Sequence, residues 1–121
     1  MTNTQQALHE AQQHQQAGRL PEARRAFLDV LKAPSQPPIV LAQIGLSLFR
    51  LGYPADAERA FQTAVSLFPD DSAAHHNLGS FYSMRHQHVR AELSYRRATV
   101  LDPDDPDTRC ALGTCLSSQG H

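Results

Sequence analysis

The sequence predicts an all-α fold, a right-handed α-solenoid of antiparallel helix pairs. The main observation is a repeat of 34 residues, the interval between Ala23, Ala57 and Ala91 (57 − 23 = 91 − 57 = 34). Other residues keep the same interval: Phe27, Phe61 and Tyr95; Gly45, Gly79 and Gly113; Pro69 and Pro103. A repeat of this length is typical of helix-turn-helix units, whose apolar faces are buried only when neighbouring units stack. We therefore expect a single domain over 1–121, with units at about 4–37, 38–71 and 72–105 and a final helix at 106–119.

Turn residues divide each unit into two helices. Gly18 and Gly52 suit helix ends where φ becomes positive, and Pro38 and Pro106 suit the first turn of a helix, where a backbone N–H is not needed. His86 stands where the first two units have glycine, so its turn is expected to be strained. The expected helices cover 3–17, 20–33, 38–51, 54–67, 72–85, 88–101 and 106–119.

The recurring residues also predict the core. Glycine and alanine at the repeated positions let two helices approach closely, and larger side chains fill the space between units. The expected large core residues are Phe27, Leu41, Ile44, Leu48, Phe61, Leu78, Tyr82, Tyr95 and Leu112.

Composition disfavours several classes of function. The chain has 11 basic and 12 acidic residues and a net charge of −1, which gives no reason to expect nucleic acid or an anionic membrane as a partner. Neither a signal peptide nor an apolar run of about 18 residues is visible. Cys110 and Cys115 are five residues apart on one expected helix, which suits neither a disulfide nor a zinc site. We expect a soluble, cytoplasmic protein.

No motif predicts catalysis, a metal or a cofactor. His75 and His76 are adjacent and so diverge on a helix, and no P-loop, GxSxG or HExxH motif is present. The acidic corners lack the glycine and terminal glutamate of a calcium loop. They are better explained as helix caps, in which Asp71 or Ser72 serves the helix at 72–85 and Asp105 the helix at 106–119. The protein is expected not to be an enzyme.

Two units carry an extended motif. The second has Leu41, Ile44-Gly45, Leu48, Gly52, Ala57, Phe61, Ala64 and Pro69, and the third has Leu78-Gly79, Tyr82, Ala91, Tyr95, Ala98 and Pro103. On these residues the whole chain resembles the tetratricopeptide repeat family. The first unit departs from the pattern at Glu10, His14 and Ser35. Its first helix is therefore expected to be the loosest, or to be displaced so that Leu8 is buried.

The resemblance implies a concave groove that is lined by the first helix of each unit and holds a peptide. The implied groove residues are Ile39, Ala42, Gln43, Leu46, Phe49, Arg50, His76, Asn77, Ser80 and Met84. Some family members grip a C-terminal carboxylate with lysine and asparagine. The matching positions here are Leu8, Gln12, Gln43, Ala73 and Asn77, and only the last has a suitable side chain. Binding of a chaperone tail is not expected.

The helix at 38–51 is unusual because it is apolar on two faces. Besides the expected core face, Ile39, Ala42, Leu46 and Phe49 share an opposite stripe at i, i+3, i+7 and i+10. Two interpretations remain open. The stripe anchors apolar residues of a peptide partner, or curvature of the array buries Ile39 and Phe49 against neighbouring first helices.

These observations predict a non-catalytic protein–protein interaction module that binds a peptide segment in a concave, partly apolar groove, as an adaptor, scaffold or chaperone-like protein. One alternative is the N-terminal recruiting arm of a larger enzyme, such as a glycosyltransferase or sulfotransferase. A second is a self-associating assembly scaffold, a homo-oligomer that buries the stripe at 38–51 or the open face of 106–119.

Overall fold

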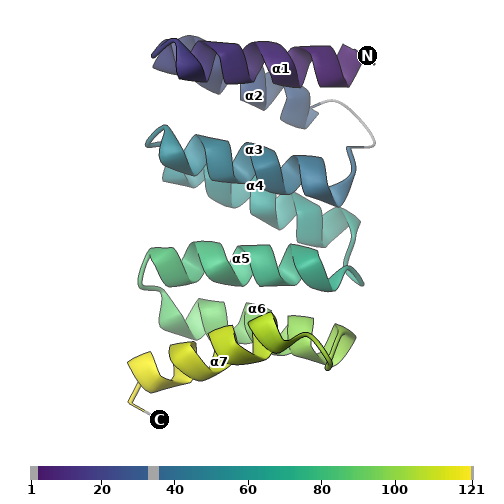
Figure 1. Cartoon of the computed structure of the whole chain (residues 1–121), viewed down its shortest axis with the longest axis vertical. Helices are drawn as coiled ribbons and strands as arrows, with labels where there is room; N and C mark the ends of the chain where they lie inside the picture. The colour runs from purple at the N-terminus through teal and green to yellow at the C-terminus, as the bar shows by residue number, and fades with distance from the viewer. Residues whose placement is uncertain (1–2, 33–35, 121) are drawn as a thin grey trace. The chain divides into compact units, whose positions relative to one another are not determined.

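The computed structural model describes residues 3–32 and 36–120, and this part of the chain contains seven α-helices and no strand (Figure 1). The helices are α1 (Asn3–Gln16), α2 (Leu20–Lys32), α3 (Pro38–Arg50), α4 (Pro54–Leu67), α5 (Ser72–Met84), α6 (His88–Leu101) and α7 (Pro106–Ser118). The predicted bounds agree to within one residue wherever the structure describes them; the predicted end at residue 33 and the departure at Ser35 lie outside the described residues. The predicted fold class is confirmed.

The chain divides into two compact units, residues 1–60 and 61–121, with the division inside α4. Each unit is described by itself, and the expectation of one domain with three repeats stays a prediction. Within the described residues, each helix is too short or too polar to span a bilayer.

In the first unit, α1 packs against α2 and α2 against α3. The core contains Ala23, Phe27, Leu41, Ile44 and Leu48, all at most 1% exposed. The expectation that Leu8 is buried is wrong: Leu8 is half-buried and Ala11 is fully buried in its place. The small alanine side chain lets α1 approach α2 closely.

A buried charge links α2 to the start of α4. The Arg24 Nε–H donates to the Asp56 carboxylate at 2.7 Å, and the Arg24 guanidinium lies 5.1 Å from the centre of the Tyr53 ring. The bond to Asp56 raises the pKa of Arg24, so the pair stays charged. Because the Asp56 side chain is only 12% exposed, removing Arg24 would leave a carboxylate largely buried with its main partner gone.

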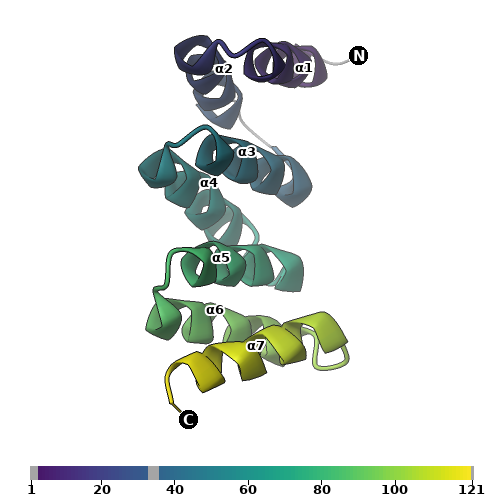
Figure 2. The same ribbon diagram turned by 60° about the vertical axis from the view of Figure 1, so that its left-hand side comes forward.

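In the second unit, α6 packs against both α5 and α7. Successive helices run in opposite directions, as the two views in Figures 1 and 2 show for α5 and α6. Phe81 and Tyr95 are buried between them, and the Phe61 and Phe81 rings lie 5.4 Å apart. Phe81 does not belong to the core set predicted from the repeat, although it is fully buried. Leu112, which does belong to it, is only half-buried.

The glycines at the repeated position differ in their surroundings. A Cβ built on Gly79 would lie 2.8 Å from the Tyr95 ring, so here glycine is required for α5 to approach α6. No described atom lies within 4 Å of the corresponding point at Gly113. The expectation that Gly113 permits a close approach is therefore wrong for the described chain, because nothing in it faces that side of α7.

Gly79→Ala and Gly113→Ala should therefore have opposite effects on stability. At position 79 the added methyl group meets a buried ring, and we expect the free energy of unfolding to fall by about 1–2 kcal/mol. At position 113 the methyl group is free, and the better helix propensity of alanine should raise it by about 0.5–1 kcal/mol. Urea denaturation followed by circular dichroism measures both changes. Equal shifts in the same direction would contradict the difference in packing.

The turns between paired helices use a left-handed residue. Gly18 and Gly52 have φ of 77° and 93°, and His86 has φ of 60° at the equivalent place. The expected strain at His86 is confirmed. The Asp105 carboxylate caps α7 by accepting from the Asp107 N–H at 3.1 Å. Asp71 is the N-cap residue of α5, but its side chain makes no capping hydrogen bond.

His86→Gly should stabilise the protein, because glycine adopts a positive φ without a steric penalty. We expect a gain of about 1 kcal/mol in the free energy of unfolding, and a higher Tm in a thermal scan. Gly52→Ala is the matched reverse exchange at an equivalent turn, with open space around the added methyl group. It should lower the Tm. A destabilised His86→Gly variant would show that the imidazole contributes more than the backbone strain costs.

Candidate functional site

The outer face of α3 carries an exposed apolar surface, which we call the α3 stripe: Ile39, Ala42, Leu46 and Phe49. Ile39 is 68% exposed and Leu46 is 37% exposed, while Ala42 and Phe49 are half-buried. The opposite face of α3 is buried in the core of the first unit. The helix is thus apolar on both sides, as predicted. The interpretation that curvature buries Ile39 is wrong, because two thirds of its surface is in contact with water.

Polar residues border this stripe on one side. Gln43 and Arg50, both in the predicted set, are seven residues apart and are both exposed. They supply an amide and a cation beside Ile39 and Leu46. The α3 surface can therefore combine apolar contacts with hydrogen bonds to a peptide backbone or a carboxylate.

The other predicted residues lie on α5, in the second unit. His76, Asn77 and Ser80 are half-buried, and Met84 is 47% exposed. The structure brings His76 and Ser80 together around Tyr95. The His76 and Tyr95 rings meet edge to face at 5.5 Å, and the Tyr95 O–H donates to Ser80 Oγ at 3.1 Å. These two polar groups therefore also have a structural role.

A hydrogen-bonded chain connects α5 to the start of α7. The Thr108 hydroxyl donates to Asp105 Oδ2 at 2.8 Å, and His76 Nδ1 lies 2.9 Å from Thr108 Oγ1. Because the only hydroxyl proton is given to Asp105, His76 donates its Nδ1–H to the hydroxyl oxygen. Thr108 is 1% exposed, so this arrangement fixes the His76 ring while leaving its Nε2 outside the chain of bonds.

Thr108 was absent from the residues predicted for this site. Its only signal is a threonine three residues after the capping Asp105 at the start of a helix, a spacing that by itself indicates a local contact. The bond to His76 joins residues 32 apart, so it depends on how α7 packs against α5.

The same bonds set the protonation of Asp105. The hydrogen bond from Thr108 lowers the pKa of the Asp105 carboxyl below its ordinary 3.8, and the Asp107 and Thr108 N–H groups and the nearby His76 act in the same direction. Partial burial opposes them without reversing the shift. The carboxylate is therefore held charged, both as a cap and as the acceptor for Thr108.

Asp105→Asn should reduce the dependence of stability on pH below about 4. A carboxyl whose pKa is lowered in the folded state stabilises the protein above its unfolded pKa, and this contribution disappears as the pH falls through the folded value. Asparagine caps a helix well, so stability at pH 7 should change little. Urea denaturation at pH 7 and pH 3 measures the difference, with Asp104→Asn as a control in the same acidic corner. Identical pH profiles for Asp105→Asn and the wild type would contradict the assignment.

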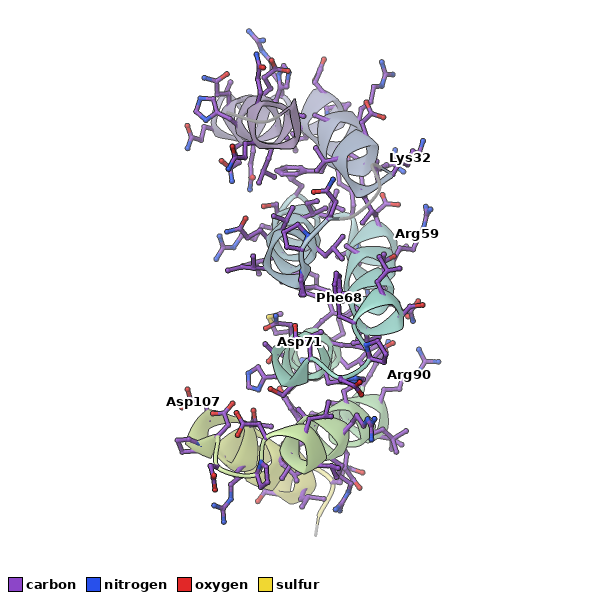
Figure 3. The ribbon with its side chains drawn as sticks, turned by 90° about the vertical axis from the view of Figure 1, so that its right-hand side faces the viewer. Lys32, Arg59, Phe68, Asp71, Arg90 and Asp107 are labelled. Atoms are coloured by element: carbon purple, nitrogen blue, oxygen red, sulfur yellow. The ribbon has the colours of Figure 1, made fainter. Side chains whose placement is uncertain are left out.

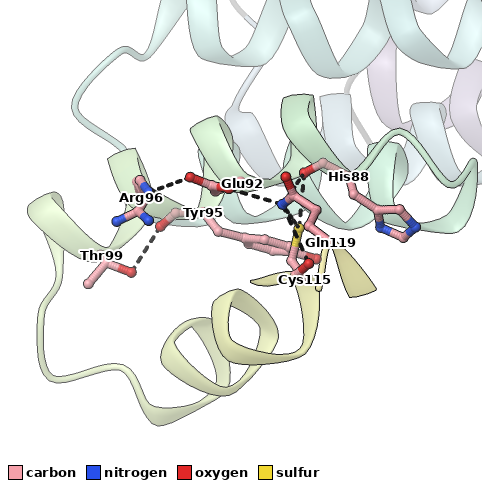
Figure 4. Close-up of polar contacts among 7 residues, drawn as sticks. All are labelled: His88, Glu92, Tyr95, Arg96, Thr99, Cys115 and Gln119. Carbon is pink, nitrogen blue, oxygen red and sulfur yellow. Dashed lines mark hydrogen bonds and ion pairs between the residues drawn. The ribbon is translucent and has the colours of Figure 1, made fainter. Parts of the chain in front are cut away.

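A second polar cluster fastens the end of α7 to α6. Gln119 Nε2 donates to Glu92 Oε1 at 2.9 Å, and the Cys115 thiol donates to the His88 carbonyl oxygen at 3.0 Å (Figure 4). Glu92 also accepts from Arg96 Nε at 2.8 Å. Cys115 is buried and Cys110 is exposed, so the expectation that the two cysteines lie on divergent faces is confirmed. In the part of the chain that is described, no three His, Cys, Asp or Glu residues are arranged to hold a metal ion.

The antiparallel helix pairs and their recurring small-to-aromatic contact define a helical-repeat protein. Residues 42–106, more than half of the chain, match the Tetratricopeptide repeat family. The chain belongs to the tetratricopeptide repeat family, whose fold is that of a protein–protein interaction module.

Similar proteins agree with this assignment. Superkiller protein 3 of Schizosaccharomyces pombe is 33% identical over 61 residues, which are 50% of this chain but only 4% of that protein. The first tetratricopeptide domain of Spaghetti (RPAP3), solved bound to the HSP90 peptide SRMEEVD, has a TM-score of 0.74 at 19% identity and covers 98% of this chain and 94% of that one. A crystal structure of MamA has a TM-score of 0.71 at 27% identity, with 91% of this chain and 64% of MamA covered. MamA from Desulfovibrio magneticus RS-1 has a TM-score of 0.74 at 19% identity, covering 98% and 67%.

Proposed function

We propose that this protein is a non-catalytic interaction module and that the α3 stripe binds an apolar segment of a peptide partner. The exposure of Ile39, at 68%, carries the proposal. An isoleucine on a helix that already buries its other face has no structural reason to remain in water. Fully burying an aliphatic side chain stabilises a complex by about 1.5–3 kcal/mol before the cost of ordering the peptide is deducted.

The bordering polar residues suggest how such a peptide is oriented. Gln43 and Arg50 lie beside the stripe and are exposed, so they are available to the backbone or to a carboxylate of the ligand. In the second unit we propose Asn77, Ser80 and Met84 as further contacts, with His76 presenting its Nε2. These α5 residues combine polar atoms with one flexible thioether, which adapts to different apolar side chains.

The ligand is not an acidic chaperone tail of the kind bound by the RPAP3 domain. The peptide SRMEEVD, which that domain binds, contains three carboxylate side chains. At the positions where relatives grip a carboxylate, this chain has Leu8, Gln12, Gln43 and Ala73, none of them charged. Neutral residues at these positions favour a neutral, apolar ligand over an acidic one.

The test is a selection of displayed peptides against the immobilised protein. We expect the enriched peptides to be apolar and to bind Ile39→Glu and Leu46→Glu at least about tenfold more weakly, because each variant opposes an apolar side chain with a charge. Leu67→Glu is the matched control, since Leu67 is 57% exposed on another helix, α4. It should bind normally, and circular dichroism should show all three variants folded.

Two results would contradict the proposal. One is a set of enriched peptides that bind the α3 variants as well as the wild type. The other is saturable binding of SRMEEVD itself in a calorimetric titration. A sedimentation mass that rises with concentration in the wild type but not in Leu46→Glu would instead assign the α3 stripe to a homo-oligomer.

A further inference from the structure

The outer face of α6 carries a second exposed apolar surface, the α6 stripe: Val89, Leu93 and Val100. These side chains are 66%, 65% and 69% exposed. At 3.6 residues per turn they fall within an arc of about 40° on one side of the helix. The opposite side of α6 is buried through Ala91, Tyr95 and Ala98. Because α7 already packs against α6 in this unit, the stripe remains exposed after all described packing is complete.

The repeat itself does not require this stripe. The residues 34 and 68 positions earlier occupy equivalent places on α4 and α2, and they are exposed there too. They are Ala55, Arg59 and Ser66 on α4, and Pro21, Arg25 and Lys32 on α2. Only the third repeat puts large aliphatic side chains at all three places, so the folding of a helix pair does not explain them.

The charges beside the stripe also change in the third repeat. Arg90 and Arg97 border it on one side, where the equivalent residues are Asp56 and Thr63 on α4. The corresponding residues of α2 are Glu22 and Asp29. The Arg90 side chain extends away from the ribbon in Figure 3. Arg97 lies 3.9 Å from Asp70, an exposed pair that contributes little and is easily exchanged for a better partner.

On the other side of the stripe Arg96 is held by Glu92 at 2.8 Å. The α6 helix thus has three arginines and one glutamate, a net charge of +2 (3 − 1 = 2), in a chain whose net charge is −1. A row of aliphatic side chains with cations along both edges is complementary to an apolar row with carboxylates along both edges.

We propose that the α6 stripe is a second docking surface, and that its partner is an amphipathic helix with aliphatic residues between acidic ones. Such a helix places apolar residues at i, i+4 and i+7 on Val89, Leu93 and Val100, and its carboxylates reach Arg90 and Arg97. This surface is separate from the α3 stripe, so the two proposals stand or fall independently.

Two other occupants fit the stripe less well. A membrane surface is best met by a helix with large aromatic or leucine-rich faces, and this stripe consists of two valines and one leucine. In a second copy, α2 offers Glu22 and Asp29 with the right spacing, but Arg25 and Lys32 lie on the same outer face. Those cations would be pressed against Leu93 and Val100.

The chain supplies its own control variant. Val89→Ala, Leu93→Arg and Val100→Ser together give α6 the outer residues of α4, so the triple variant should fold. A library of displayed helical peptides is selected against the wild type. We expect winners with acidic residues beside an aliphatic row, at least about tenfold weaker binding to the triple variant, and about threefold or more weaker binding to Arg97→Glu. Binding should also weaken with salt. Ile39→Glu should leave these peptides unaffected.

Several outcomes would overturn the proposal. One is that no helical peptide is enriched, or that the winners lack acidic residues or bind the triple variant as tightly as the wild type. Another is that the wild type binds phosphatidylserine vesicles and the triple variant does not, which assigns the stripe to a membrane. A third is a concentration-dependent mass that the triple variant abolishes, which assigns it to a second copy. Peptides sensitive only to Ile39→Glu would support the α3 proposal and count against this one.

Discussion

The contact between Gly79 and Tyr95 is the constraint on which the second unit depends. A helix pair of this length has few large side chains, so it becomes stable only if two backbones approach closely and enclose the rings that are present. Tyr95 lies flat enough against Gly79 that even a methyl group would collide with it. The ring is then fixed at both ends of its polar and apolar edges, by the bond from its hydroxyl to Ser80 and by the His76 ring. The same approach positions α7, because His76 also binds Thr108.

This economy of large side chains makes the exposed ones informative. Phe27, Phe81 and Tyr95 are needed inside, and the helices use alanine and glycine wherever two backbones meet. Against that background, an exposed isoleucine on α3 and an aliphatic row on α6 are expensive in solubility and add nothing to the packing. Family membership explains why the helices are there, but the interaction surfaces are argued from residues in which one repeat differs from the others. This distinction matters because structural neighbours below 25% identity share the fold without sharing a ligand.

The polar contacts of α7 had no counterpart in the repeat pattern. Thr108, Cys115 and Gln119 are bonded to groups on α5 and α6 that lie 27 to 32 residues away in sequence. Side chains of this kind are common on helix surfaces, where they usually face water. Their roles follow only from the angle at which α7 crosses the preceding pair. The open side at Gly113 has the same origin, since the repeat position is kept although no described residue faces it.

By itself, the sequence determined the helices, their turns and the core, because a period of 34 residues with glycine, alanine and aromatic residues in phase is a local property of the chain. It also identified α3 as a helix with two apolar faces, since that is a matter of spacing alone. Tertiary structure decided which of those faces stays in water, which core residue replaces Leu8, and which polar side chains meet across helices. These depend on distances between segments far apart in sequence, and a pattern of residue types specifies such distances only after the helices have packed.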